Sequence, residues 1–409
     1  MSDWRRRDVL RLGLTLLGAG ASMRPAELAA ALASSPATPP RARFVVLCEL
    51  TGGLDTLAWL APAADPAYTR LRARLAWRTA DGWDVGGGLF LRDHLRALQP
   101  VASAGELAVV GPIGPQRHER SHFRARDLWS WGPDATPGGE GLLGRRLHRA
   151  AGRVAEVWVG QSDAAALHGG RVIGFGHPDG ALRPRRSSPT PGPDHGAAAR
   201  TPAAAAAMAH LLTVQRDLHA AEAELARRLG AVERPPGAPR TPIGAQVEMV
   251  AWLLAAGLHA PCFAIALDGF DTHALQAQKL AGRLPMLAEA LAWLRTELQR
   301  QDRWQDARVL TWTEFGRRAG ENASGGTDHG GGAFALALGA GVHGGVHSAL
   351  AGAGGAAKIG LNALDQGDLP RVLGPESVWS TVAAYLGPRQ VRPLPGEPAP
   401  LAAVIGTVG

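Results

Sequence analysis

Short, continuous apolar runs recur along this chain and constrain its fold more than any other feature. They cover residues 43–50, 107–113, 154–159, 262–267, 309–313 and 334–338. A run of this length without polar alternation is typical of a strand that is buried on both faces. Helices are expected between the runs, and the clearest is at 279–301, where leucines recur at spacings of three and four residues. Further helices are expected at 203–229 and 243–257.

Alternating strands and helices predict an α/β fold. The sheet should be mostly parallel and covered by helices on both faces, which gives three layers. Hydrophobic residues make up 46% of the chain and charged residues 19%, as in an ordinary globular protein. The two cysteines, Cys48 and Cys262, lie inside apolar runs, so we expect them to be buried free thiols.

Residues 1–33 have the features of a twin-arginine signal peptide. The pair Arg6-Arg7 is followed by apolar residues, a basic residue and a moderately apolar stretch that is too short for a permanent membrane anchor. Ala31–Ala33 offers a small-x-small cleavage site, and other sites nearby serve equally well. Arg5 departs from the pattern, because Ser or Thr usually precedes the pair. We expect the twin-arginine translocase to export the folded protein, which would then be periplasmic or secreted.

The remaining chain is expected to form one domain. Residues 34–42 are a Pro-rich linker, and the domain should cover 43–409. Two segments inside it, 177–202 and 234–242, are rich in Pro and Gly and are expected to be loops.

The net charge limits the classes of partner. The formal charge is +7, of which the signal segment carries +3, so the exported chain would carry +4. This charge favours solubility and a mild attraction to small anionic substrates. The basic residues are scattered arginines without interleaved aromatic residues, so no nucleic-acid partner is expected.

Acidic residues and histidines stand beside glycines at the ends of four apolar runs. In open α/β sheets, ligands bind beyond the carboxyl ends of the strands. Carboxylate and neutral imidazole groups suit a divalent metal such as zinc, manganese or calcium, and thiolates are absent from these segments. Taken singly, each segment also suits a turn that is capped by its aspartate. The residues are Asp55, Asp271, His273, Glu314, Asp328 and His329.

Five segments together carry a family resemblance. They are Gly52–Asp55, Arg120–Phe123 with Asp127, Gly269–His273, Thr313–Arg317 and Gly326–Gly330. With them the chain resembles domain of unknown function 1501, a family of exported bacterial proteins with an alkaline-phosphatase-like fold related to sulfatases. The resemblance covers most of the chain after the linker, and the last three segments in this order are the most specific.

The resemblance implies metal ligands at the matching positions. In the wider superfamily, an aspartate after the first strand and an adjacent Asp-His pair bind metal, and these match Asp55, Asp328 and His329. Asp271 and His273 would contribute to the same ion or to a second one, although they are two residues apart where the superfamily has four. A further histidine is expected late in the chain, where His343 and His347 are available.

The resemblance also implies a nucleophile at a helix N-terminus, which Ser121 matches. The helix dipole and a nearby metal would lower the pKa of its hydroxyl, but serine equally suits simple helix capping. Glu314 is a candidate ligand or general base, or a partner of Arg317. Arg317 would clamp an anionic ester bidentately, or form a salt bridge at the end of the sheet. His118 and His122 flank the serine and are expected to be solvated or core histidines.

Three functions compete at this point. The first is an exported metal-dependent hydrolase of small phosphate or sulfate esters. The second is a non-catalytic exported binding or scaffold protein with a degenerate fold of the same kind, which the altered Asp271–His273 spacing favours. The third is a serine hydrolase that uses Ser162, whose surroundings nearly match G-x-S-x-G, but this leaves the metal-type segments unexplained. The sequence contains no P-loop and no dinucleotide fingerprint.

Overall fold

An eight-stranded sheet lies at the centre of the described chain. The computed structural model describes residues 42–115, 119–132, 141–144, 156–159, 172–175, 220, 223–348, 359, 361–387, 401 and 404. In spatial order, the strands are β11 (Gly345–Ser348), β5 (Leu107–Ile113), β10 (Ala333–Leu338), β9 (Ala307–Trp312), β1 (Phe44–Leu50), β8 (Cys262–Leu267), β6 (Glu156–Val159) and β7 (Val172–Phe175). All residues of β1, β5 and β9 are buried, which explains their largely apolar sequences; Glu49 and Arg308 are the charged exceptions.

The sheet is mostly parallel, and β10 is the exception among the described strands. β1 pairs in parallel with β8 and β9, whereas β10 pairs antiparallel with both β5 and β9. Because β10 is antiparallel to β9, the loop that connects them lies at the same edge of the sheet as the loops that follow β1 and β8. We call this edge the carboxyl edge.

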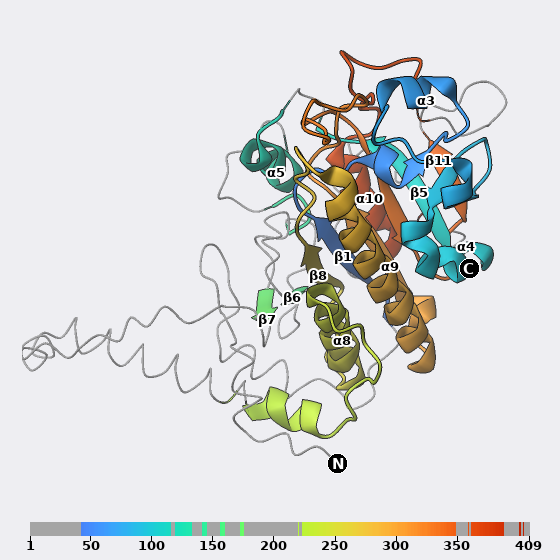
Figure 1. Ribbon diagram of the computed structural model, residues 1–409. Helices are drawn as coiled ribbons and strands as arrows, with labels where there is room; N and C mark the ends of the chain where they lie inside the picture. The colour runs from blue at the N-terminus through green and yellow to red at the C-terminus, as the bar shows by residue number, and fades with distance from the viewer. Residues whose placement is uncertain are drawn as a thin grey trace, which may run out of the picture.

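Helices cover both faces of the sheet (Figure 1). α8 (Pro242–Ala255) and α9 (Gln276–Arg300) pack against each other on one face, and α5 (His122–Trp131) and α10 (Pro375–Leu386) lie on the other. The side chains of β1 alternate between two hydrophobic cores. Val46 and Cys48 belong to the core beneath α8 and α9, and Val45 and Leu47 to the core beneath α5 and α10.

A small second sheet and several short helices lie outside these layers. The sheet has the order β2 (Leu60–Ala61), β4 (Phe90–Arg92), β3 (Gly82–Asp84) and is antiparallel. The short helices are η1 (Thr56–Ala58), α3 (Pro66–Leu71), η2 (Thr79–Asp81), η3 (Asp93–Leu98), α4 (Gln99–Ser103) and η5 (Trp304–Asp306). η3 packs against α9, so this part of the chain covers the side of α9 that faces away from α8.

The predicted α/β fold with three layers and a mostly parallel sheet is confirmed. All six apolar runs form strands, and the predicted helices at 243–257 and 279–301 correspond to α8 and α9. The leucine stripe of α9 is buried, and each of its leucines stabilises the fold by about 1.5–3 kcal/mol. Cys48 and Cys262 are buried free thiols, as predicted.

Other predictions fall partly or wholly outside the described residues. Of the predicted helix at 203–229, the structure describes Ala220 and residues from 223 onward, which are helical up to 230. The signal peptide, nearly all of the linker and the segment 177–202 are not described, so the division into 1–33, 34–42 and 43–409 stays a prediction. Within the described ranges, no helix combines the length and the apolar character needed to cross a membrane.

Candidate metal centre

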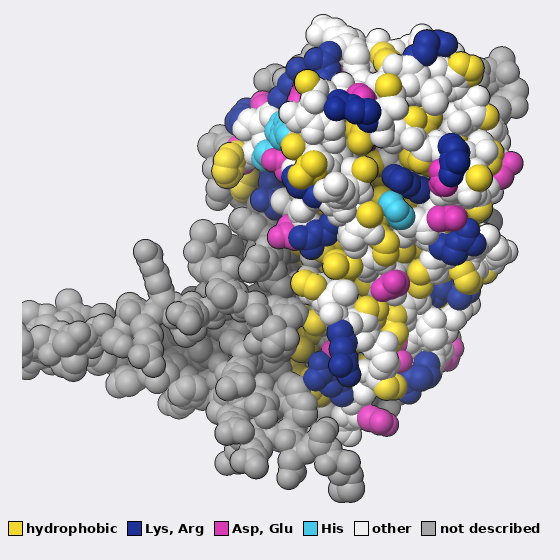
Figure 2. Space-filling view, viewed as in Figure 1, with side chains coloured by type: hydrophobic (Ala, Val, Ile, Leu, Met, Phe, Trp, Pro, Cys, Tyr) yellow, Lys and Arg dark blue, Asp and Glu magenta, His cyan; other side chains and the backbone are white. Residues whose placement is uncertain are grey.

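Loops at the carboxyl edge bring most of the predicted site residues together. Two of these loops follow β1 and β8, a third connects β9 to β10, and the N-terminus of α5 adds a fourth segment. Two glycines allow backbone-to-backbone contact between the loops. A Cβ atom on Gly52, whose φ is +119°, would lie 2.2 Å from the backbone nitrogen of Asp271, and one on Gly326 would lie 2.3 Å from the carbonyl carbon of His273. Histidine, acidic and basic side chains lie next to one another at the upper left of Figure 2.

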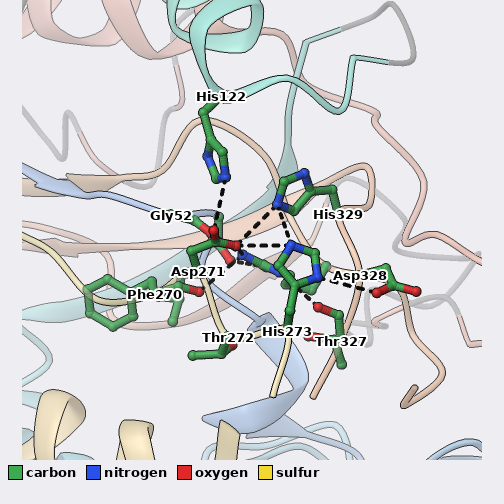
Figure 3. Close-up of polar contacts among 12 residues, drawn as sticks. Gly52, His122, Phe270, Asp271, Thr272, His273, Thr327, Asp328 and His329 are labelled. Carbon is green, nitrogen blue, oxygen red and sulfur yellow. Dashed lines mark hydrogen bonds and ion pairs between the residues drawn. The ribbon is translucent and has the colours of Figure 1, made fainter. Parts of the chain in front are cut away.

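Asp271 is the centre of a polar cluster (Figure 3). Its Oδ1 atom lies 3.2 Å from Nε2 of His329 and 3.2 Å from Nε2 of His273. Its Oδ2 atom lies 3.5 Å from Nε2 of His122. Three imidazole rings from three segments therefore approach one carboxylate, each through the same nitrogen. We call these four residues the Asp271 cluster.

The other nitrogen of each ring is held by an oxygen that carries no hydrogen. The pairs are His122 with Glu314 (2.7 Å), His329 with the carbonyl of Arg120 (2.6 Å) and His273 with Asp328 (3.3 Å). Carbonyl and carboxylate oxygens only accept hydrogen bonds, so each Nδ1 donates and each Nε2 keeps its lone pair. Proteins orient metal-binding histidines in this way.

The cluster has the donor set of a divalent-metal site. Nε2 of His273 and Nε2 of His329 lie 2.9 Å apart, a distance at which the two nitrogens share either a proton or a cation. Nε2 of His122 is buried and has no hydrogen-bond partner among the described residues. Metal-binding atoms of His122, Asp271 and His329 all lie within 4.8 Å of one another. Imidazole and carboxylate donors together suit zinc, so the residues present fit the predicted metal.

The pKa shifts of Asp271 and His329 favour cation binding, whereas that of His122 opposes it. Burial of the Asp271 carboxyl opposes its ionisation, but its contacts with Arg317 and His329 outweigh burial and lower its pKa to about 2. Burial lowers the pKa of His329 below its usual value. The hydrogen bond to Glu314 raises the pKa of His122, so this ring must release its proton before it can bind a metal from acidic solution.

Glu314 is fully buried behind His122. Its carboxylate accepts hydrogen bonds from the backbone N–H of Gly52 (2.9 Å) and from the hydroxyl of Thr313 (3.1 Å), besides the one from His122. Burial opposes ionisation of Glu314, but the hydrogen bonds from His122 and Gly52 lower its pKa. These contacts are those of a carboxylate that orients a histidine, and a direct catalytic role for Glu314 stays a prediction.

Arg317 holds the loops of the site together through hydrogen bonds from its guanidinium. Its buried guanidinium donates to Oδ1 of Asp271 (2.5 Å) and to four backbone carbonyls. These carbonyls belong to Gly52, Gly53, Phe270 and Thr327. The side chain thus fixes the position of Asp271 and balances its charge, while its predicted role as a clamp for an ester stays a prediction.

Asp55 lies in a separate, buried network at the same edge. Its carboxylate accepts two hydrogen bonds from Arg72, one from the backbone N–H of Leu57 and one from the side chain of Gln276. Gln276 in turn accepts hydrogen bonds from the hydroxyls of Thr272 and Thr327. In the sequence, Thr272 lies between Asp271 and His273, and Thr327 precedes Asp328. The structure therefore connects Asp55 to the cluster through Gln276, without a direct contact. A metal-binding role for Asp55 stays a prediction.

Ser121 is the N-cap of α5, directly before His122. Its Oγ atom accepts the backbone N–H of Arg124, and its own N–H donates to Glu119 (2.9 Å). The capping geometry is present, and the nucleophile prediction stays untested. Ser162 and His118 lie outside the described residues.

The late histidines do not lie at the carboxyl edge. His343 precedes β11, which is parallel to β5, so it lies at the opposite edge of the sheet, where its carbonyl accepts a hydrogen bond from His347 (2.7 Å). The third histidine of the cluster is His122, for which the sequence predicted a solvated or core position. Its place in the first turn of the helix after the β5 strand, another strand that ends at the carboxyl edge, was the available signal.

The fold and the cluster together define an α/β protein with a candidate divalent-metal centre at the carboxyl edge of its sheet. Residues 183–362 match the model of a family described as "Protein of unknown function (DUF1501)". This match covers less than half of the chain; it agrees with the family resemblance that the motifs indicated, and three of the five motifs lie within it. No curated protein matches the chain.

Solved structures that are similar to the chain include three with TM-scores below 0.5. The C-terminal periplasmic domain of EcEptC from Escherichia coli, in complex with Zn, is 8% identical with a TM-score of 0.37, covering 80% of this chain and 77% of that one. The lipoteichoic acid synthase LtaP from Listeria monocytogenes is 8% identical with a TM-score of 0.35, covering 93% and 80%. A protein in the alkaline phosphatase superfamily from Vibrio parahaemolyticus is 8% identical with a TM-score of 0.32, covering 80% and 70%. These similarities concern the fold alone.

Proposed function

We propose that this chain binds one divalent metal ion in the Asp271 cluster and hydrolyses anionic esters, phosphate or sulfate, after export from the cytoplasm. The observation that carries the proposal is the approach of three Nε2 atoms to one carboxylate while each Nδ1 is held by an acceptor. Nitrogen donors favour zinc or manganese over calcium, which prefers oxygen ligands.

The metal ligands would be His122, Asp271, His273 and His329. A bound ion in such a site lowers the pKa of a bound water or polarises a phosphoryl or sulfuryl oxygen. Glu314 and Asp328 hold the rings of His122 and His273 in the orientation that directs Nε2 to the ion. Asp55 is already hydrogen-bonded by Arg72, Gln276 and the backbone of Leu57, so it is not placed to bind a second ion. A single ion is therefore favoured over a pair.

Ser121 is the proposed nucleophile. Its position at the N-terminus of α5 would stabilise negative charge that develops on Oγ. The adjacent residue, His122, is a cluster member, so the serine begins the same helical turn that supplies a metal ligand. Arg317 would act through Asp271, by holding the carboxylate in place.

Elemental analysis after cytoplasmic folding tests the metal site. We expect the purified protein to contain about one zinc or manganese ion per chain. His122→Ala and Asp271→Asn should lose the ion, whereas His343→Ala, a change to an exposed histidine at the opposite edge, should retain it. Protein that contains no metal and binds none on addition would contradict the proposal.

A panel of phosphate and sulfate esters then tests catalysis. Turnover that is lost in Ser121→Ala, with metal content unchanged, would support the serine as nucleophile. A protein that binds the ion but turns over none of the esters would instead favour the non-catalytic binding alternative.

A further inference from the structure

An arginine-lined groove of about 1270 Å³ lies beside the Asp271 cluster. Its walls come from the loops after β1 and β8, from α5, and from the start of α8 with the Pro-rich segment 234–242 that precedes it. The loop after β8 and the helix α5 also supply members of the Asp271 cluster. The groove and the cluster are therefore parts of one surface.

Backbone contacts show how close the two are. The carbonyl of Thr51, which lines the groove, accepts the N–H of Phe270, the residue before Asp271, at 3.2 Å. Arg126, another lining residue, lies four residues after His122 on α5, a rise of about 6 Å. A ligand that occupies the groove would thus extend to the edge of the cluster.

The groove carries an excess of positive charge. Among the residues that the structure describes, four arginines line it against two acidic residues, Glu248 and Asp268, and the buried Glu49 pairs with Arg126, which leaves one positive charge in excess. Glu248 already pairs with Arg234, and Asp268, which is largely exposed, lies 3.6 Å from Arg283. Guanidinium groups bind phosphate and sulfate oxygens through paired N–H donors. The arginines are Arg126, Arg234, Arg240 and Arg283.

The Pro-rich wall of the groove is preorganised. Segment 234–242 contains four prolines, each of which fixes φ and removes a backbone donor. The carbonyl of Pro236 accepts a hydrogen bond from the indole of Trp293 (3.1 Å), and that of Pro239 accepts one from the N–H of Thr241 (2.8 Å). Gln246 then ties α8 to the last residues of β8 by hydrogen bonds to both the N–H and the carbonyl of Ala266. A wall held in this way loses little freedom when a ligand binds.

We propose that this groove binds a second anionic group, phosphate or sulfate, of an extended substrate whose reacting ester lies at the Asp271 cluster. The identity of the reacting group rests on the proposed function, whereas anion binding in the groove does not. The proposed substrate is then an oligomer that carries several anionic groups rather than a small monoester.

Binding of two probes to the full chain tests the proposal. Calorimetric titration with inorganic tripolyphosphate and with a multiply sulfated disaccharide separates the two sources of anion. Arg240→Gln and Arg283→Gln should each weaken binding of at least one probe by roughly tenfold. The control Arg78→Gln, an exposed arginine that pairs with Asp81 in η2, should leave the affinity unchanged.

A cluster variant separates the failure of this inference from the failure of the proposed function. His122→Ala should keep the arginine-dependent binding of the probes even though it loses the metal. Probe binding that is unaffected by both arginine changes, or that disappears in His122→Ala alone, would overturn the groove proposal. Arginine-dependent binding by a protein that hydrolyses no ester would support the groove and refute the hydrolase.

Discussion

Asp55 and Asp271 lie at the same edge of the sheet, yet their surroundings are opposite. Asp55 is 1% exposed, and protein donors satisfy both of its oxygens through Arg72, Gln276 and a backbone N–H. Asp271 is 49% exposed and faces three imidazole nitrogens whose lone pairs point inward. One network is complete within the protein, and the other has the donor atoms for the proposed cation.

The comparison shows that position at a sheet edge predicts proximity but does not decide a role. A carboxylate whose hydrogen bonds and charge are matched internally stabilises the fold. Asp271 has a partner in Arg317, and the imidazole nitrogens around it are where the proposed ion would bind. Substitutions should therefore separate the two regions, one through stability and the other through metal affinity.

The largest expected effect is on stability. Asp55→Ala leaves the fully buried Arg72 without its partner, and we expect the free energy of unfolding to fall by about 3–5 kcal/mol. Asp65→Ala, which removes only the cap of α3, should cost about 1 kcal/mol. Urea denaturation of both variants measures the difference, and equal losses would contradict the distinction between the two networks.

Glu314→Gln should act on the metal with less effect on folding. The amide keeps an acceptor for the N–H of Gly52 but removes the charge that orients His122. We expect the affinity for zinc to fall by about 10- to 100-fold, as for other losses of an orienting carboxylate. Competition with a chromogenic chelator measures this change. An unaltered affinity would exclude His122 from the metal site.

Metal affinity should depend on pH through His122. Its pKa is raised by Glu314, so below that pKa the imidazolium competes with the ion, and affinity should rise with pH by at most about tenfold per unit before it levels off. In Glu314→Gln the pKa of His122 should return toward its usual value, which moves the levelling point to lower pH. Titrations between pH 5 and about 8 would reveal the shift, and identical profiles would contradict it.

The smallest expected effect belongs to Asp328→Asn. Asp328 is 55% exposed, and its contact with His273 is long at 3.3 Å, so solvent weakens its hold on the ring. We expect zinc affinity to fall by less than tenfold, in the same chelator assay. A loss equal to that of Glu314→Gln would show that Asp328 binds the ion itself.

The sequence predicted the sheet well because its central strands are buried on both faces. All six predicted strands coincide with largely apolar runs, and the leucines of α9 recur at helical spacing. β11 was missed because it is short and only partly buried, with the pattern exposed or half-buried throughout. The strands of the small sheet have two or three residues each, too few for any periodicity.

The site was predicted in part. Asp271, His273, Asp328 and His329 meet because the carboxyl ends of neighbouring strands meet, which is a rule of the fold. Which side chain of each loop points into the site depends on contacts with residues that are far away in the sequence. Arg72 pairs with Asp55, and Glu314 holds His122, and neither contact is visible in local sequence.

The reversed direction of β10 has a consequence for how this chemistry could be altered or moved. Glu314, Arg317, Asp328 and His329 all lie on one connection, residues 313–332, because β9 and β10 are antiparallel neighbours. One uninterrupted stretch of chain thus holds the acid that contacts His122, the arginine that fixes Asp271 and a proposed metal ligand. Exchanging this one stretch between related proteins would therefore replace Glu314, Arg317, Asp328 and His329 together.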